Sequence, residues 1–133
     1  MRDYVHRQTA ILLRRFGIQV TRAARDGDPD AIHDLRVSIR RLSRCLRVFA
    51  RFYPGRGWKK FRRRLKDLMD ACACVRDRDV ALDVLARGGF PPTSIVMRSL
   101  HRDRASAHVE LMLLLARWKQ RGASGKWRAQ IGI

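Results

Sequence analysis

One segment, residues 28–53, constrains the fold more than any other part of the chain, because it holds the start signal, the periodicity and the stop signal of one long helix. Asp28 is suited to cap the helix and Pro29 to occupy its first position. Pro54 and Gly55 then end it. Apolar side chains recur between these signals in alternating steps of three and four, at Ile32, Leu35, Ile39, Leu42, Leu46 and Phe49. A helix with one apolar face has to pack against other elements, so a helical core is expected.

The same periodicity recurs in three further segments, and no strand pattern or Asn-Gly hairpin is present. Helices are expected at about residues 3–25, 29–53, 58–86 and 94–120. Turns rich in Gly and Pro separate them, and residues 122–133 are expected to form a loosely ordered tail. The sequence therefore predicts a single all-α domain, residues 1–133, built as an antiparallel four-helix bundle of long helices.

A second face of the segment 28–53 is cationic. Its members fall within a sector of roughly 80° around the helix and are His33, Arg36, Arg40, Arg44 and Arg47. Like charges at this spacing repel by a few tenths of a kcal/mol per pair, so the stripe is either a solvated face or a site for a polyanion. The following helix has a basic sector of its own, made of Lys59, Arg62, Arg63 and Lys66, of which Arg62 and Lys66 are the candidate site residues. A short turn between antiparallel helices could bring the two basic sectors together around a groove.

The charge balance favours the polyanion. The chain has 30 Lys and Arg against 12 Asp and Glu, a formal net charge of +18. Nearly all the cations are Arg, whose planar fork binds phosphate oxygens in pairs, whereas Lys offers a point charge. A phosphate-bearing partner is therefore expected.

Other classes of protein are disfavoured. No apolar run approaches the roughly 20 residues that span a bilayer, and the N-terminus lacks the apolar segment of a signal peptide. A soluble, cytoplasmic protein with no membrane partner is expected. Cys45, Cys72 and Cys74 are odd in number, which argues for reduced thiols. The Cys-x-Cys pair has no neighbouring ligands to complete a tetrahedral set, so neither a metal site nor a cofactor is expected.

The segment from Val75 to Val80 alternates charges of opposite sign. It fits equally well an ion-pair network that ties the helix to its neighbours and an anion-binding arginine oriented by a carboxylate. In the second case Arg76 is the better ligand candidate, because it lies between the apolar and basic sectors of its helix.

Two motifs stand between Gly27 and Leu85. The first, H-x-L-R-V-x-x-R-R-L, is matched by His33, Leu35, Arg36, Val37, Arg40, Arg41 and Leu42, and the second, V-R-D-x-D-V, by Val75, Arg76, Asp77, Asp79 and Val80. Together they closely resemble the CHAD family, helical domains named for a characteristic histidine and known for binding inorganic polyphosphate. The resemblance implies that His33 and the arginines of its helix, Arg41 included, line a basic groove for phosphate chains, with Arg62 and Lys66 opposite.

The resemblance also bears on assembly. Family members usually carry two such helical units related by a pseudo-two-fold axis, and this chain contains one. Either two copies pair to rebuild the doubled arrangement or the chain is a truncated or stand-alone half domain. A homodimer is the favoured expectation, because it would bury apolar surface that the second unit normally covers. The charge of +18 opposes this pairing unless a polyanion is present.

The expected function is a binding module for inorganic polyphosphate, in the cytoplasm or on polyphosphate granules. Affinity should fall steeply with salt, and protonation of His33 should tighten binding as the pH falls toward about 6. Non-specific nucleic-acid binding is the first alternative, although aromatic residues are few and scattered. An enzyme that acts on phosphoanhydrides is the second, although the chain shows no Gly-rich phosphate loop and no carboxylate cluster; no catalytic residue is predicted.

Overall fold

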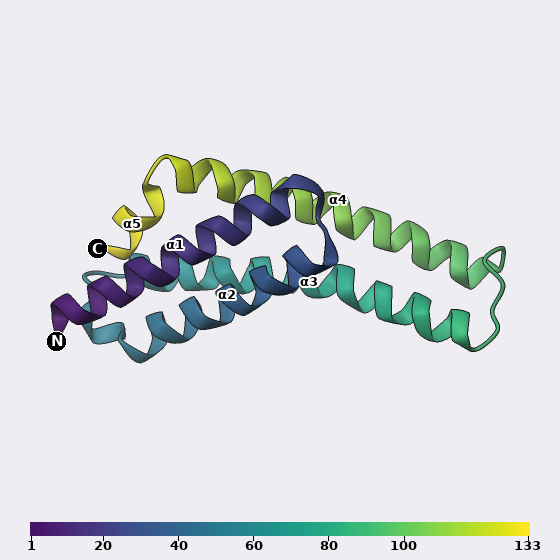
Figure 1. The fold of residues 1–133 in the computed structure, drawn as a ribbon, viewed down its shortest axis with the longest axis horizontal. Coiled ribbons are helices and arrows are strands. Elements are labelled where there is room, and N and C mark those ends of the chain that lie inside the picture. The colour runs from purple at the N-terminus through teal and green to yellow at the C-terminus, as the bar shows by residue number, and fades with distance from the viewer.

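Helices make up nearly the whole of the computed structural model, which describes residues 1–133. They are α1 (Arg2–Asp26), α2 (Pro29–Val48), α3 (Gly57–Arg87), α4 (Ile95–Ala123) and α5 (Lys126–Ile131), with a 3-10 turn at Ala50–Phe52. The predicted all-α class is confirmed. The first four helices are long and run antiparallel to their chain neighbours, and α3 and α4 extend well beyond α1 and α2 (Figure 1).

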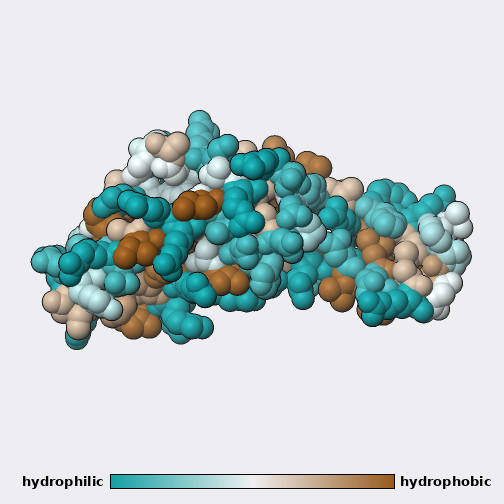
Figure 2. Space-filling view, in the orientation of Figure 1, coloured by the Kyte–Doolittle hydropathy of each residue, from teal (hydrophilic) through white to brown (hydrophobic).

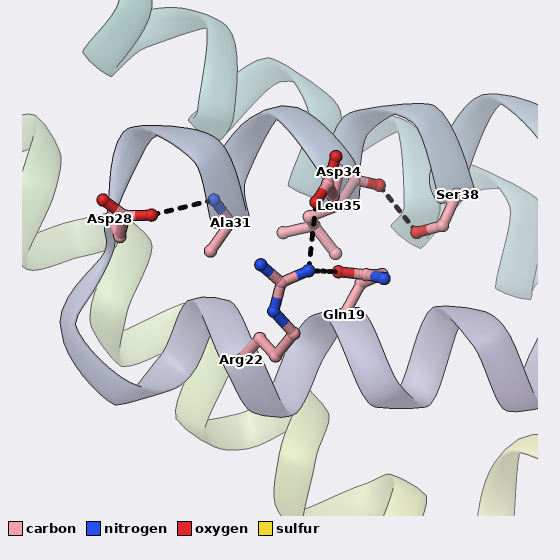
Figure 3. Close-up of polar contacts among 7 residues, drawn as sticks. All are labelled: Gln19, Arg22, Asp28, Ala31, Asp34, Leu35 and Ser38. Carbon is pink, nitrogen blue, oxygen red and sulfur yellow. Dashed lines mark hydrogen bonds and ion pairs between the residues drawn. The ribbon is translucent and has the colours of Figure 1, made fainter.

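The α1–α2 turn shows how local chemistry sets the start of α2. Gly27 ends α1 in the left-handed region at φ 70°, where a Cβ atom would also lie 2.5 Å from Cε1 of His108 on α4. The Asp28 carboxylate accepts a hydrogen bond from the Ala31 backbone N–H at 3.3 Å (Figure 3). The predicted cap is therefore confirmed, and it satisfies one of the free N–H groups of the first turn.

Charged side chains join the same two helices on their exposed side. The guanidinium of Arg22 on α1 donates to the Gln19 side chain at 2.9 Å and to the Asp34 carboxylate of α2 at 3.0 Å (Figure 3). An exposed pair of this kind contributes at most about 1 kcal/mol. The pair therefore adds little to the alignment of α1 with α2, which is set mainly by the packing of their buried faces.

The predicted end of the second helix at residue 53 is wrong. The α-helix stops at Val48, a 3-10 turn follows, and Tyr53 adopts extended backbone. This path turns the Tyr53 side chain into the core, where its hydroxyl lies 2.7 Å from the Thr9 hydroxyl of α1 and 3.6 Å from the Cys45 thiol. Burial raises the Tyr53 pKa well above its usual value.

The core confirms the apolar seam expected of α2. Five of its six members are at least nine-tenths buried and Phe49 is half-buried. An aromatic cluster fills the end of the bundle nearest the termini, with Phe16 of α1 and Phe61 of α3 both 5.3–5.4 Å from Trp118 of α4, ring centre to ring centre. The long helices are therefore joined by one continuous apolar core.

The tail expected at residues 122–133 is instead ordered. Helix α4 continues to Ala123, and α5 folds back so that Trp127 and Ile131 are buried. The Trp127 ring lies 5.1 Å from Phe16 and 5.6 Å from Trp118. A six-residue helix has no stability of its own, so the burial of these two side chains holds α5 in place.

The extended part of α3 and α4 has little core. The last buried residue of α3 is Val75, and between Met97 and Leu111 helix α4 has none. Val80, Val84 and Val96 are 47–61% exposed. In Figure 2 apolar atoms show among the hydrophilic ones both along α1 and toward this end of the molecule. None of the helices contains a stretch long and apolar enough to span a membrane.

Candidate functional site

A basic groove of about 590 Å³ lies between α2 and the first turns of α3. Seven cationic side chains line it, namely Arg40, Arg44, Arg47, Lys59, Arg62, Arg63 and Lys66. Ile39, Trp58 and Met69 form apolar parts of its wall, and no carboxylate lines it. The groove therefore offers positive charge along its whole length.

The helical repeat explains why these side chains meet. Arg40, Arg44 and Arg47 follow one another in steps of four and three along α2, so they project from one side. Helix α3 runs antiparallel to α2 after a short connection (Figure 1), which sets its first turns against the last turns of α2. The two basic sectors therefore face a common groove.

The positive charge of the groove is almost unneutralised. Lys66 alone among the seven makes an ion pair, with Asp70 at 3.3 Å, and both side chains are well exposed. The Arg62 Nε donates to the Ser43 hydroxyl at 3.3 Å, which holds the guanidinium near α2. Repulsion between cations so close together would be relieved by a bound anion. The arrangement suits several anionic groups in a row.

Five of the predicted site residues are brought together by the groove: Arg40, Arg44, Arg47, Arg62 and Lys66. Lys59 and Arg63 were absent from the predicted set, although both lie in the same basic sector of α3 as Arg62 and Lys66. Their spacing was signal enough to include them. Trp58 was also missed, because nothing in the sequence shows that it faces this side of its helix.

Arg41 is placed elsewhere. It lines a cavity of about 440 Å³ between α1 and α2, together with Asp34 and Arg15. One residue advances about 100° around a helix, so Arg41 cannot face the same way as Arg40. The structure does not bring Arg41 to the groove.

His33, Arg36 and Arg76 do not line the groove. His33 and Arg36 continue the α2 stripe toward its N-terminus. Arg36 is half-buried, and its Nε is buried without a hydrogen-bond partner. It neighbours Cys72 of α3: burial raises the pKa of that thiol to about 11, and the Arg36 charge opposes the shift.

The charged residues that follow Val75 have different partners. Asp79 accepts from Arg104 of α4 at 2.8 Å, so one carboxylate ties α3 to α4 as the network interpretation predicts. Arg78 donates to the Cys74 carbonyl oxygen at 3.2 Å. Arg76 is exposed and makes no ion pair, which leaves its guanidinium free for an anion.

Comparison with known proteins gives one finding. The sequence model of the family described as CHAD domain matches residues 10–130, nearly the whole chain. No curated protein and no solved structure matches the chain. Within the structure, no group of three or more His, Cys, Asp or Glu side chains is placed to hold a metal ion.

Proposed function

The chain belongs to the CHAD domain family, which is associated with polyphosphate binding, and from that premise we propose that it binds inorganic polyphosphate in the groove between α2 and α3. The observation that carries the proposal is the groove lining, in which seven cations are gathered and no carboxylate is present. Binding alone, without chemistry on the phosphate chain, is proposed.

The shape of the site suits a linear ligand. From Arg40 to Arg47 the α2 side of the groove spans about 10 Å at 1.5 Å per residue, and the stripe back to His33 doubles that length. Each phosphate paired with a cation releases condensed counterions, which is the main source of affinity for a polyanion. Arginine adds paired hydrogen bonds to phosphate oxygens.

The proposed contacts differ from the expected set in two ways: Lys59 and Arg63 are added, and Arg41 is removed. The seven lining cations form the main site, and His33, Arg36 and Arg76 extend it for longer chains. Helices α2 and α3 are antiparallel, so the N-terminal part of α2, with His33 and Arg36, lies beside the part of α3 that leads to Arg76. These three residues would therefore extend the groove at the same end. Arg41 is left out, because it faces the cavity between α1 and α2.

We also infer that two copies associate through the part of α3 and α4 that extends beyond α1 and α2. The exposed valines of this part, Val80, Val84 and Val96, would be covered by a partner. Charge does not oppose contact there: residues 76–108 hold six arginines and four aspartates, a net charge of +2 out of +18. Charge repulsion would therefore oppose the contact of two copies at the groove but not at this end of the molecule.

Calorimetric titration with long-chain polyphosphate at near-physiological salt tests the groove. The variant Arg44→Gln/Arg62→Gln should lose at least tenfold in affinity. The control Arg7→Gln/Arg25→Gln removes the same charge from exposed positions of α1 and should bind within about twofold of the wild type. Equal losses in both variants would show that net charge, and not the groove, holds the ligand.

Nucleic acid is the competing ligand that this experiment must include. Single-stranded and duplex nucleic acid, titrated at matched phosphate concentration, should bind more weakly and should be displaced by polyphosphate. Equal affinity for every polyanion would favour a non-specific binding protein. The stacking platform that single-strand binders use is absent from the groove, where Trp58 is the one aromatic side chain.

A further inference from the structure

A second cluster of arginines lies where α3 faces α4 and α5 instead of α2. A cavity of about 220 Å³ lies between these three helices, with Arg64 and Asp67 on α3, Arg117 and Arg121 on α4, and Gln130 on α5. Phe61, Trp118 and Trp127 contribute aromatic walls. We propose that this cavity is a second anion site, which takes one compact phosphate group of the kind found in pyrophosphate or at the end of a nucleotide.

The first argument is unneutralised charge. Arg64, Arg117 and Arg121 line one small cavity, and none of them makes an ion pair; the pairs in the structure involve Arg22, Lys66, Arg87 and Arg104. Asp67 lines the same cavity and makes no ion pair either. Three guanidinium groups at one opening repel one another, and a bound oxyanion would relieve this repulsion through paired hydrogen bonds.

The second argument is an unsatisfied donor. The indole N–H of Trp127 is buried and has no hydrogen-bond acceptor, and the residue as a whole is only 7% exposed. A buried donor without a partner costs about 1–3 kcal/mol. Trp127 is one wall of this cavity, and it also lines a cavity of about 590 Å³ on the α1 side, beside Arg14, Arg15 and Arg128. A phosphate held by the arginines would supply the missing acceptor, directly or through one water.

Size and position separate this site from the groove. Cavities for drug-sized ligands measure about 300–1,000 Å³, so 220 Å³ suits a smaller group. At 100° per residue, the pair Arg64 and Asp67 lies roughly 150° around α3 from the pair Arg62 and Lys66. A ligand in the groove therefore cannot reach the second cavity across α3.

The three tryptophans make the two sites distinguishable in one experiment. Trp58 lines the groove, whereas Trp118 and Trp127 line the second cavity. Two-dimensional NMR of ¹⁵N-labelled protein resolves one indole N–H signal for each, assigned through single Trp→Phe variants. Titration with pyrophosphate should shift the Trp127 signal saturably, and because Trp127 also lines the cavity beside Arg14, Arg15 and Arg128, loss of this shift in Arg117→Gln/Arg121→Gln assigns it to the cavity proposed here.

Variants that remove the same charge from different places show whether the Trp127 response comes from binding in the cavity or from the net charge of the protein. Arg117→Gln/Arg121→Gln should weaken the pyrophosphate response of Trp127 at least tenfold. Arg44→Gln/Arg47→Gln removes the same charge from the groove and should change that response by less than about twofold. Arg117→Lys, which keeps the charge and loses the fork, should weaken it by a few-fold and serves if the double variant does not fold.

Each outcome has a meaning. Movement of the Trp58 signal alone, or equal weakening by both double variants, would overturn the proposal. Because the groove has its own reporter and its own variants, failure of the second site leaves polyphosphate binding untouched, and the reverse also holds. Adenosine diphosphate is titrated in parallel: tighter binding than pyrophosphate identifies a nucleotide as the source of the phosphate, and equal or weaker binding identifies inorganic phosphate.

Discussion

The arginines of this chain are of two kinds, those held by a carboxylate and those left free. Arg22, Arg87 and Arg104 each pair with an aspartate at 2.8–3.2 Å, and all of these pairs are at least partly exposed. Exposed pairs contribute at most about 1 kcal/mol, so their main effect is to orient side chains. The arginines of the groove have no such partner, and their free guanidinium groups are what a phosphate chain can use.

Cys72 makes stability depend on pH at the alkaline end. Burial raises its pKa from 9.0 to about 11, so the folded protein keeps the thiol proton over a range in which the unfolded chain releases it. Because the folded state binds more protons there, the free energy of unfolding should fall as the pH rises from about 9 to about 11, by at most about 2–3 kcal/mol. Urea unfolding at fixed intervals of pH measures this loss.

The control for this prediction is Cys72→Ala, which should lose less stability over the same range. Equal losses in the variant and the wild type would assign the effect to other groups, such as Tyr53, whose pKa is also raised by burial. Cys74 is exposed and provides a second readout. A thiol reagent at pH 8 should modify Cys74 and leave Cys72 unmodified in the folded protein.

At the scale of the elements, α5 shows how a short helix depends on its neighbours. The six-membered ring of Trp127 lies between Gly17 of α1 and Gly122 of α4. A Cβ atom at Gly122 would meet that ring at 2.7 Å, whereas one at Gly17 would meet it at 3.4 Å, an ordinary contact distance. Close packing on α4, and looser packing on α1, therefore hold α5 against the bundle.

Two substitutions of the same kind should consequently have opposite effects. Gly17→Ala should stabilise the protein by about 0.5–1 kcal/mol, because alanine is the better residue inside a helix and the space is sufficient. Gly122→Ala should destabilise it, since overpacking costs about 1–3 kcal/mol and outweighs the same gain. Thermal unfolding followed by circular dichroism measures both, and stabilisation by Gly122→Ala would show that α5 is not packed as described.

At the scale of the whole molecule, the charge is unevenly distributed. Residues 76–108 hold +2 of the net charge of +18, so nearly all the excess lies on the bundle end, where the groove and the second cavity are found. A field of this kind accelerates encounter with a polyanion and is strongly screened by salt. The same distribution leaves the far end of α3 and α4 able to meet another copy.

Polyphosphate affinity should depend steeply on salt. With seven cations in the groove and the coefficient of about 0.7 per charge for single-stranded polyanions, a plot of log affinity against log salt should have a slope of about −5. Arg44→Gln/Arg62→Gln should make the slope shallower by between about 1 and 2, whereas Arg7→Gln/Arg25→Gln should leave it nearly unchanged. The slope is measured from the affinities at four or more salt concentrations. A slope near −1 would exclude a site made of several cations.

Association of two copies should be visible by analytical ultracentrifugation. A dimer should form with polyphosphate or at raised salt, where repulsion between the two charges of +18 is screened. Val80→Asp/Val84→Asp should abolish it without unfolding the monomer, because these side chains are 49% and 61% exposed. Val109→Asp/Leu113→Asp changes equally exposed residues outside this part and should still dimerise. A monomer under every condition would contradict the inference.

Four long helices, the α2 cap and the cationic stripe were predictable from the sequence alone, because capping and the 3.6-residue repeat act within a few residues of one another. The membership of the groove was only partly predictable. Periodicity gives the angle of a side chain around its own helix, but the rotation of α2 against α3 is set by packing. That packing brought Trp58 into the groove and left Arg41 on the side of α1, whereas the spacing of Lys59 and Arg63 had already placed them in the basic sector of α3.

Two further features were decided by contacts between residues far apart in the chain. The helix that periodicity continues to residue 53 stops at Val48, because the buried Tyr53 hydroxyl meets Thr9 of α1, 44 residues earlier. The last turn of the chain is a helix and not a tail, because Trp127 finds a place among Phe16, Phe61 and Trp118. Capping and periodicity do not predict features that are stabilised by burial against distant segments of the chain. In this protein those features are the membership of the groove, the 3-10 turn and α5.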